Sequence, residues 1–173
     1  TQAQRIAVFE NKRAFVRHTQ MDAFGFYAYD DRTIYTYARS GYGTLWHELM
    51  HAAVHQNAKC TPPDWFNEGL ASFYEMAVLR DGHVVGGFTN WRHPILKAAI
   101  ERGKVTPLAT LMRKTELSAA DLALARFVFV YLWLHGELES FARAYLRDCP
   151  AVPLWRGEPL ARIEADLLKI AWE

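Results

Sequence analysis

The segment His47-Glu48-Leu49-Met50-His51 constrains this chain more than any other part of the sequence. The residues around it, from about Thr44 to Asn57, have a helical pattern, with Thr44 as the expected N-cap. Residues four apart lie on one face of a helix, one turn apart, so both imidazoles can reach a single ion. Glu48 is rotated by about 100° from His47 and would lie beside that ion, where a base can take a proton from a metal-activated water. The pattern therefore predicts a metal-binding helix.

Glu68 is the residue that the sequence favours as a third ligand. The rigid Pro62-Pro63 pair predicts a turn that returns a second helix, about Trp65 to Leu79, beside the first, with Glu68 in its first turn. Two imidazoles and a carboxylate are good ligands for zinc and leave a fourth position for water. We therefore expect Zn²⁺ to be bound by His47, His51 and Glu68. The alternative is that the helix dipole alone favours a glutamate in this first turn.

His55 continues the spacing of His47 and His51, but we do not expect it to be a ligand. At a rise of about 1.5 Å per residue, His47 and His55 are about 12 Å apart along the helix, too far to share an ion at bond lengths near 2 Å. The intervening Ala52-Ala53-Val54 favours a continuing helix over a turn. We expect His55 to be structural or exposed.

The two motifs together, HELMHA and PPDWFNEGLASFYE, resemble those of the gluzincin metallopeptidases, and most closely the small peptidase MA-like domains. The resemblance includes expected strands around Gly25-Phe26-Tyr27 and Thr33-Ile34-Tyr35, and it covers most of the chain up to about Arg147. It implies a zincin-like fold and zinc-dependent hydrolysis of peptide bonds, with a peptide or protein as substrate. It also implies roles for the residues above: His47, His51 and Glu68 match the metal ligands, and Glu48 matches the catalytic base.

The chain departs from the family's pattern at two places. Many gluzincins have an acidic residue four positions after the third ligand, hydrogen-bonded to a ligand imidazole. Here Ser72 stands there, so its hydroxyl or a backbone carbonyl would have to accept that N–H. Gluzincins also use a downstream Tyr or His to stabilise the developing oxyanion. Tyr131 is the leading residue for this role, with a core aromatic as the alternative, and His83 and His93 are weaker choices.

The other patterns predict an α+β fold, in which a small N-terminal sheet packs on the HExxH helix and a mainly helical part follows. The first forty residues favour strands, and Asp30-Asp31-Arg32 suits a hairpin turn. Asp81-Gly82 is expected to end the second helix, and the segment to Thr89 to be irregular or a short hairpin. The expected strands are Ile6 to Phe9, Phe24 to Tyr29 and Thr33 to Tyr37. The expected later helices are Pro94 to Arg102, Pro107 to Arg113, a long helix opened by a capping box at Ser118 and interrupted at Gly136, and a last helix from Pro159.

Composition narrows the classes of function. A chain of 173 residues is the size of one domain, so we expect residues 1–173 to form a single domain. Twenty basic and nineteen acidic residues give a net charge of +1, which does not favour binding to nucleic acid. The longest apolar run, Leu122 to Leu134, contains Arg126 and is shorter than the roughly eighteen residues of a membrane span.

The start of the chain and its cysteines bear on localisation. The chain begins at Thr1, without a charged segment followed by an apolar signal core, so either a leader was removed or the segment belongs to a longer protein. This favours an extracytoplasmic location, periplasmic or secreted. Cys60 and Cys149, the two cysteines, are either free thiols or a disulfide that would fit an oxidising compartment.

Two other classes of function compete with a peptidase. A catalytically inactive, metal-stabilised binding or scaffold module of the same fold would keep the ligands without turnover. Ser72 and the unassigned oxyanion group favour this alternative. A helical interaction domain without metal would require both motifs to be accidental. Digestion of a peptide mixture with and without a chelator separates these classes.

Overall fold

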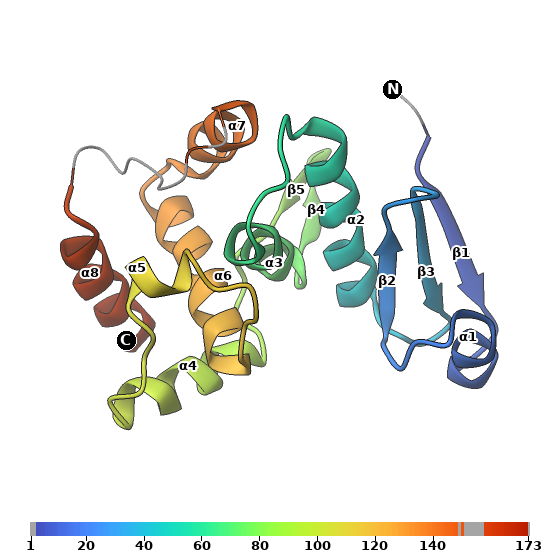
Figure 1. The fold of residues 1–173 in the computed structure, drawn as a ribbon, viewed down its shortest axis with the longest axis horizontal. Helices are drawn as coiled ribbons and strands as arrows, with labels where there is room; N and C mark the ends of the chain where they lie inside the picture. Colours follow the sequence, from blue (N-terminus) through green and yellow to red (C-terminus); the bar gives the residue numbers. More distant parts are fainter. Residues whose placement is uncertain (1–2, 149, 151–157, 173) are drawn as a thin grey trace.

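The computed structural model describes residues 3–148, 150 and 158–172. These residues form eight helices and five strands in two small sheets, which confirms the expected mixture of strands and helices (Figure 1). The larger sheet is N-terminal, and most of the helices follow it in the chain. The expected loop around Pro153 and Gly157 lies outside the described residues. Cys149 also lies outside them, so the question whether Cys60 and Cys149 form a disulfide falls outside the described part of the chain.

The N-terminal sheet contains the three strands that the sequence predicts. They are β1 (Arg5–Phe9), β2 (Gly25–Ala28) and β3 (Thr33–Tyr37), in the order β1-β3-β2. Strand β3 pairs with β2 in the antiparallel direction, which confirms the hairpin turn, and with β1 in the parallel direction. Strand β2 therefore forms one edge of this sheet.

Helix α1 (Lys12–Thr19) was missed by the prediction that the first forty residues form strands. Parallel pairing of β1 with β3 requires the chain to cross back between them, and α1 lies within that connection. Asn11 caps the helix by accepting a hydrogen bond from the Ala14 N–H at 3.0 Å, and Phe15 is fully buried. The prediction therefore overlooked a local cap signal.

Helix α2 (Tyr42–Asn57) carries the HExxH motif and lies between the sheet and α3 (Asp64–Tyr74) (Figure 1). A small apolar cluster of Tyr27, Ile34 and Ala52 joins the sheet to α2. The expectation that Thr44 caps α2 was wrong. The helix begins at Tyr42 after Gly41, and the Thr44 hydroxyl donates a hydrogen bond to the Ser40 carbonyl at 3.1 Å.

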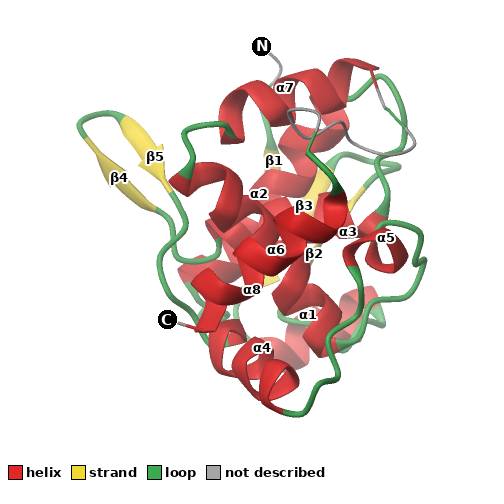
Figure 2. Cartoon of the chain, turned by 90° about the vertical axis from the view of Figure 1, so that its left-hand side faces the viewer, coloured by secondary structure: helices red, strands yellow, loops and turns green. Residues whose placement is uncertain are grey.

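Helix α3 ends at Tyr74 instead of near Leu79, and the chain then forms the hairpin of β4 (Val78–Arg80) and β5 (His83–Val85). Asp81-Gly82 was wrongly expected to end the helix. Both residues have positive φ, +49° and +77°, which is the conformation of a tight two-residue hairpin turn. Figure 2 shows this hairpin extending away from the helices.

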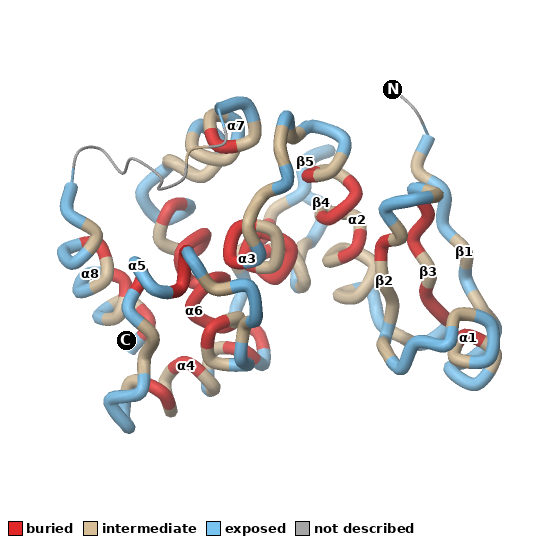
Figure 3. The backbone as a smooth tube through the Cα atoms, in the orientation of Figure 1, coloured by how far each residue is buried: buried red, intermediate tan, exposed pale blue. Residues whose placement is uncertain are grey.

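The main core surrounds α6 (Ala119–Leu134), whose predicted capping box of Ser118 and Asp121 is confirmed. Helices α3 and α6 approach closely at Gly69, where a Cβ atom would lie 2.7 Å from the Ala125 carbonyl oxygen. Figure 3 shows that both helices are largely buried. This packing holds α3 against α2. The other helices around α6 are α4 (Arg92–Glu101), α5 (Leu108–Leu111), α7 (Leu138–Asp148) and α8 (Leu160–Trp172).

None of the described helices is long and apolar enough to span a membrane.

Candidate metal centre

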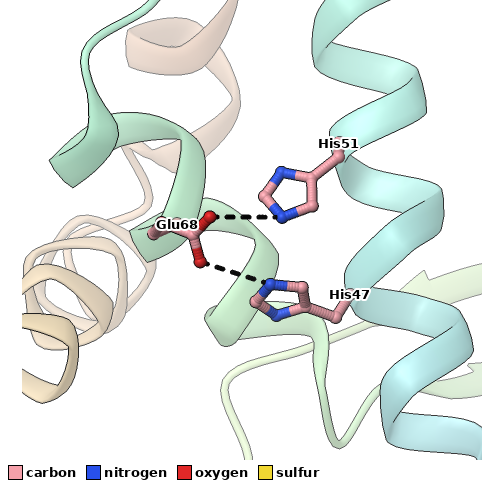
Figure 4. A group of neighbouring side chains, drawn as sticks. All are labelled: His47, His51 and Glu68. Carbon is pink, nitrogen blue, oxygen red and sulfur yellow. Dashed lines mark ion pairs between the residues drawn. The ribbon is translucent and has the colours of Figure 1, made fainter. Parts of the chain in front are cut away.

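His47, His51 and Glu68 meet between α2 and α3 (Figure 4). The Nε2 atom of His47 is 3.3 Å from one carboxylate oxygen of Glu68, and the Nε2 atom of His51 is 3.4 Å from the other. The structure thus brings together the three side chains that the sequence analysis selected as ligands. Helix α3 begins at Asp64, directly after the Pro62-Pro63 turn, so Glu68 is its fifth residue and lies in the second turn, not in the first turn as expected. From there its carboxylate lies opposite both imidazoles.

The spacing of these three side chains can be compared with that of ligands around a tetrahedral cation. Two atoms bound to one zinc ion at 2.0–2.1 Å and at the tetrahedral angle lie about 3.4 Å apart. The two imidazole-to-carboxylate separations, 3.3 and 3.4 Å, are close to that value but end on different oxygens of Glu68. One donor atom from each residue lies within 4.8 Å of the others, so a single Glu68 oxygen would have to move toward both imidazoles when an ion binds. Two neutral nitrogen donors and one carboxylate also form a ligand set that zinc accepts. The three side chains are therefore of a chemical type that suits zinc, and they are close enough to hold one ion after a small movement of the Glu68 carboxylate.

Each imidazole also has a polar partner on its other nitrogen. Nδ1 of His51 is hydrogen-bonded to Oδ1 of Asn67 at 3.0 Å, and Nδ1 of His47 lies 3.2 Å from Oε1 of Glu75. The His47 contact has the distance of an ion pair without the alignment of a hydrogen bond. Such partners orient an imidazole so that Nε2 faces the ion.

Glu75 supplies the acidic group that the sequence analysis looked for at Ser72. The Ser72 hydroxyl is fully buried and has no hydrogen-bond partner among the described residues. Glu75 is held by Arg92, which donates hydrogen bonds to both carboxylate oxygens, and by Asn90, whose amide donates at 2.9 Å. The sequence signal for Glu75 was its spacing of seven residues, two helical turns, from Glu68.

Burial and the neighbouring charges set the pKa values of the two imidazoles and of Glu68. Burial disfavours the charged form of His47, but the neighbouring Glu68 and Glu75 outweigh burial and raise the pKa of His47 to about 9. Burial, and then the positive charge of His47, lower the pKa of His51. For Glu68, burial favours the neutral acid, but the two imidazoles outweigh this effect and lower the pKa of Glu68. The site therefore contains opposite charges held close together.

Glu48 lies beside this group without belonging to it. Its side chain is buried in α2, and burial raises the pKa of Glu48 to about 7, against the opposing effect of His47. Glu48 and His47 line a pocket of about 540 Å³. Three exposed apolar side chains, from Phe24, Met76 and Trp91, also line this pocket. The carboxyl group that could act as a base is thus next to a space that could hold a substrate.

The structure places the other predicted residues elsewhere. His55 is hydrogen-bonded through Nδ1 to the Tyr27 hydroxyl at 2.9 Å and is not part of the metal-ligand group. Tyr131 packs against the helical core, with its ring 4.2 Å from that of His135, and does not line the pocket that contains Glu48. His83 is exposed in β5, and His93 contacts the Ala171 carbonyl of α8 at 2.9 Å.

Tyr29 is a neighbour of the site that the sequence analysis missed. It follows β2 directly, is 49% exposed, and accepts a hydrogen bond from the Asn67 amide at 3.1 Å. Burial of its ring, and the negative charges of Glu68 and Glu48, raise the pKa of Tyr29. Its position at the end of the expected strand Phe24 to Tyr29 was the available signal.

Comparison of the chain with protein-family models, with curated proteins and with solved structures found no match.

Proposed function

We propose that this protein is a zinc-dependent metallopeptidase in which His47, His51 and Glu68 bind Zn²⁺ and Glu48 is the general base. The observation that carries this proposal is the meeting of three ligand side chains from two helices beside a buried glutamate that lines a pocket. The zincin-like fold and membership of the gluzincins are part of the same proposal. The sheet that packs on the HExxH helix supports them.

The residues of this chain would divide the chemistry between them. Bound zinc would polarise the scissile carbonyl and acidify a water molecule. Glu48, buried beside the three ligands, would accept a proton from that water and return it to the leaving amine. Glu75 and Asn67 would keep the imidazoles of His47 and His51 turned toward the ion.

A peptide is the substrate class that best fits the surroundings of Glu48. The pocket of about 540 Å³ has the size of a small-molecule site and can take a side chain with the adjoining backbone. Strand β2 is an edge strand, contacts α2, and contributes Gly25 to the pocket. An edge strand offers unpaired backbone groups with which an extended peptide can pair.

An inactive binding or scaffold module is the second candidate function. Its specific support is that Tyr131, the expected oxyanion donor, does not line the pocket with Glu48. Such a module would bind zinc with the same three residues and would not turn over a peptide.

The decisive experiment digests a proteome-derived peptide library with the zinc-loaded chain, with and without a chelator. A peptidase cleaves the library, loses activity with chelator and regains it when Zn²⁺ is restored. One equivalent of bound zinc without cleavage supports the inactive module. A chain that binds no zinc contradicts both candidates. Glu48→Gln is the matched control, because it alters the base and leaves the three ligands in place.

A further inference from the structure

Arg126, in the middle of α6, is a buried guanidinium that the proposed mechanism does not use. Its side chain is 1% exposed and donates a hydrogen bond through Nη2 to the Phe88 carbonyl. In the described part of the chain, its Nε has no hydrogen-bond partner. Burial lowers the pKa of Arg126 to about 10, so the side chain still carries its charge at neutral pH.

The stability of the fold does not account for an arginine at this position. A buried guanidinium has five N–H donors and a large desolvation cost, and here one backbone carbonyl accepts from it. An apolar side chain of similar length is expected to fit a buried position at no greater cost. The reason for the arginine therefore has to lie in what its hydrogen bond holds in place.

The Phe88 carbonyl belongs to the segment of residues 86–91 that joins β5 to α4. Two residues further on, the Asn90 amide donates to Glu75 at 2.9 Å, and its side-chain oxygen accepts from the Arg92 N–H at 3.0 Å. Arg92 in turn donates to Glu75 through Nη2 at 2.6 Å. This segment thus carries Asn90 and leads directly into Arg92, the first residue of α4, and these two side chains hold Glu75 against His47.

Besides the hydrogen bond from Arg126 to Phe88, this segment is also held at its beginning. The Gly87 N–H donates to the Phe73 carbonyl at 3.0 Å, and Gly86 and Gly87 pack against the Phe73 ring. The Phe88 side chain is 36% exposed and does not fix the chain in the core. The contact with Arg126 therefore holds the backbone between Gly87 and Asn90.

We propose that Arg126 is a positioning residue for the metal centre. It fixes the Phe88 carbonyl, the segment then sets Asn90 and Arg92 on Glu75, and Glu75 orients the imidazole of His47. The negative charge of Glu75 also acts on Arg126, which places the two groups within electrostatic range. This inference rests on the proposed metal site and adds a residue from α6, a helix that provides none of the three ligands.

The test measures the dissociation constant of Zn²⁺ by chelator competition for the wild type, Arg126→Met, Glu75→Gln and the double variant. Loss of the direct partner of a ligand weakens metal binding by about 10- to 100-fold, so Glu75→Gln should raise the Kd within this range. Arg126→Met acts through Glu75 and should raise the Kd by about 3- to 30-fold. Its metal-free Tm should change by no more than about 4 °C. When Arg126→Met is introduced into Glu75→Gln, the Kd for Zn²⁺ should rise by less than about twofold further, because the effect of Arg126 passes through Glu75.

Asp121→Ala is the control, because it removes a buried polar group from the start of the same helix, in contact with Ser118 and Lys114. It should lower the Tm and leave the Kd unchanged. The inference is overturned if Arg126→Met binds Zn²⁺ like the wild type, if its effect persists in the Glu75→Gln background, or if Asp121→Ala weakens zinc binding equally.

Arg126→Gln, which is too short to hold Phe88 in the same way, is measured alongside and should raise the Kd to the same extent. Failure of both Arg126 variants to fold would show a structural role and overturn the inference. A wild-type chain that binds no Zn²⁺ contradicts the proposed function as well, so the two failures are distinguishable.

Discussion

Oε1 of Glu75 lies 3.2 Å from Nδ1 of His47, although Glu75 stands just beyond the end of α3, as the last residue of the PPDWFNEGLASFYE motif, and was assigned no role from the sequence. Arg92 and Asn90 hold the carboxylate from the opposite side. Burial favours the neutral acid, but His47 and Arg92 outweigh it and lower the pKa of Glu75. Glu75 therefore stays ionised beside the imidazole that it orients.

Glu48→Gln should separate chemistry from metal binding. The amide keeps the size of the side chain but cannot accept a proton at neutral pH. Peptide hydrolysis should therefore fall at least about 100-fold, the lower range for loss of a general base. Zinc content and Tm should match those of the wild type. His47→Ala, by contrast, should lose both zinc and activity, as measured by metal analysis and a peptide assay. Near-normal turnover of the Gln variant would rule out the proposed mechanism.

Two tyrosines should respond differently to loss of their hydroxyl groups. Tyr29→Phe removes the hydroxyl that accepts from Asn67, the partner of His51, and should weaken zinc binding by less than the factor of about ten expected for loss of Asn67 itself. Tyr131→Phe should leave both zinc affinity and the catalytic rate within about twofold, because Tyr131 packs against the helical core. Chelator competition and peptide kinetics on the two variants provide the comparison. A large loss of rate in Tyr131→Phe would show that the residue reaches the substrate after all.

Zinc binding should release a proton at neutral pH. The pKa of His47 is raised to about 9, so its imidazole is protonated at pH 7 and must lose that proton before it can bind a metal. Zinc affinity should therefore rise about tenfold per pH unit from pH 7 and level off near pH 9. Calorimetry in two buffers with different ionisation enthalpies measures the released protons. Binding with no proton release would contradict the assigned charge on His47.

Asp121→Asn should lower stability in a pH-dependent way. Burial alone would raise the pKa of Asp121, but Lys114 at 2.5 Å and the two Ser118 donors outweigh burial and lower it. Because the native pKa lies below the unfolded value of about 3.9, the stabilisation is complete above about pH 5 and is lost as the pH falls through the native pKa. Urea unfolding at pH 7 should show a loss of about 2 kcal/mol. The difference in free energy of unfolding between variant and wild type should become smaller between pH 5 and pH 3. A difference that stays constant would contradict this assignment.

Several features could be predicted because they depend on neighbouring residues alone. The spacing of His47 and His51 specifies one face of a helix wherever that helix packs. The capping box at Ser118 and the break at Gly136, which has a φ of +69°, are also local, and both agree with the structure. Local signals were misread at Asn11, which caps α1, and at Asp81-Gly82, which forms a hairpin turn.

The sequence by itself determined the pattern that brings His47, His51 and Glu68 together, because helix geometry and the diproline turn are encoded within a short segment. Only the tertiary structure decided what surrounds that pattern. Glu75, Asn90 and Arg126 come from three separate segments, and their contacts depend on how α6 and the β5–α4 connection pack around α3. Spacing along the chain places Glu75 two turns after Glu68, but it carries no information about the contacts of Asn90 and Arg126, because those arise when distant segments bury their apolar faces together.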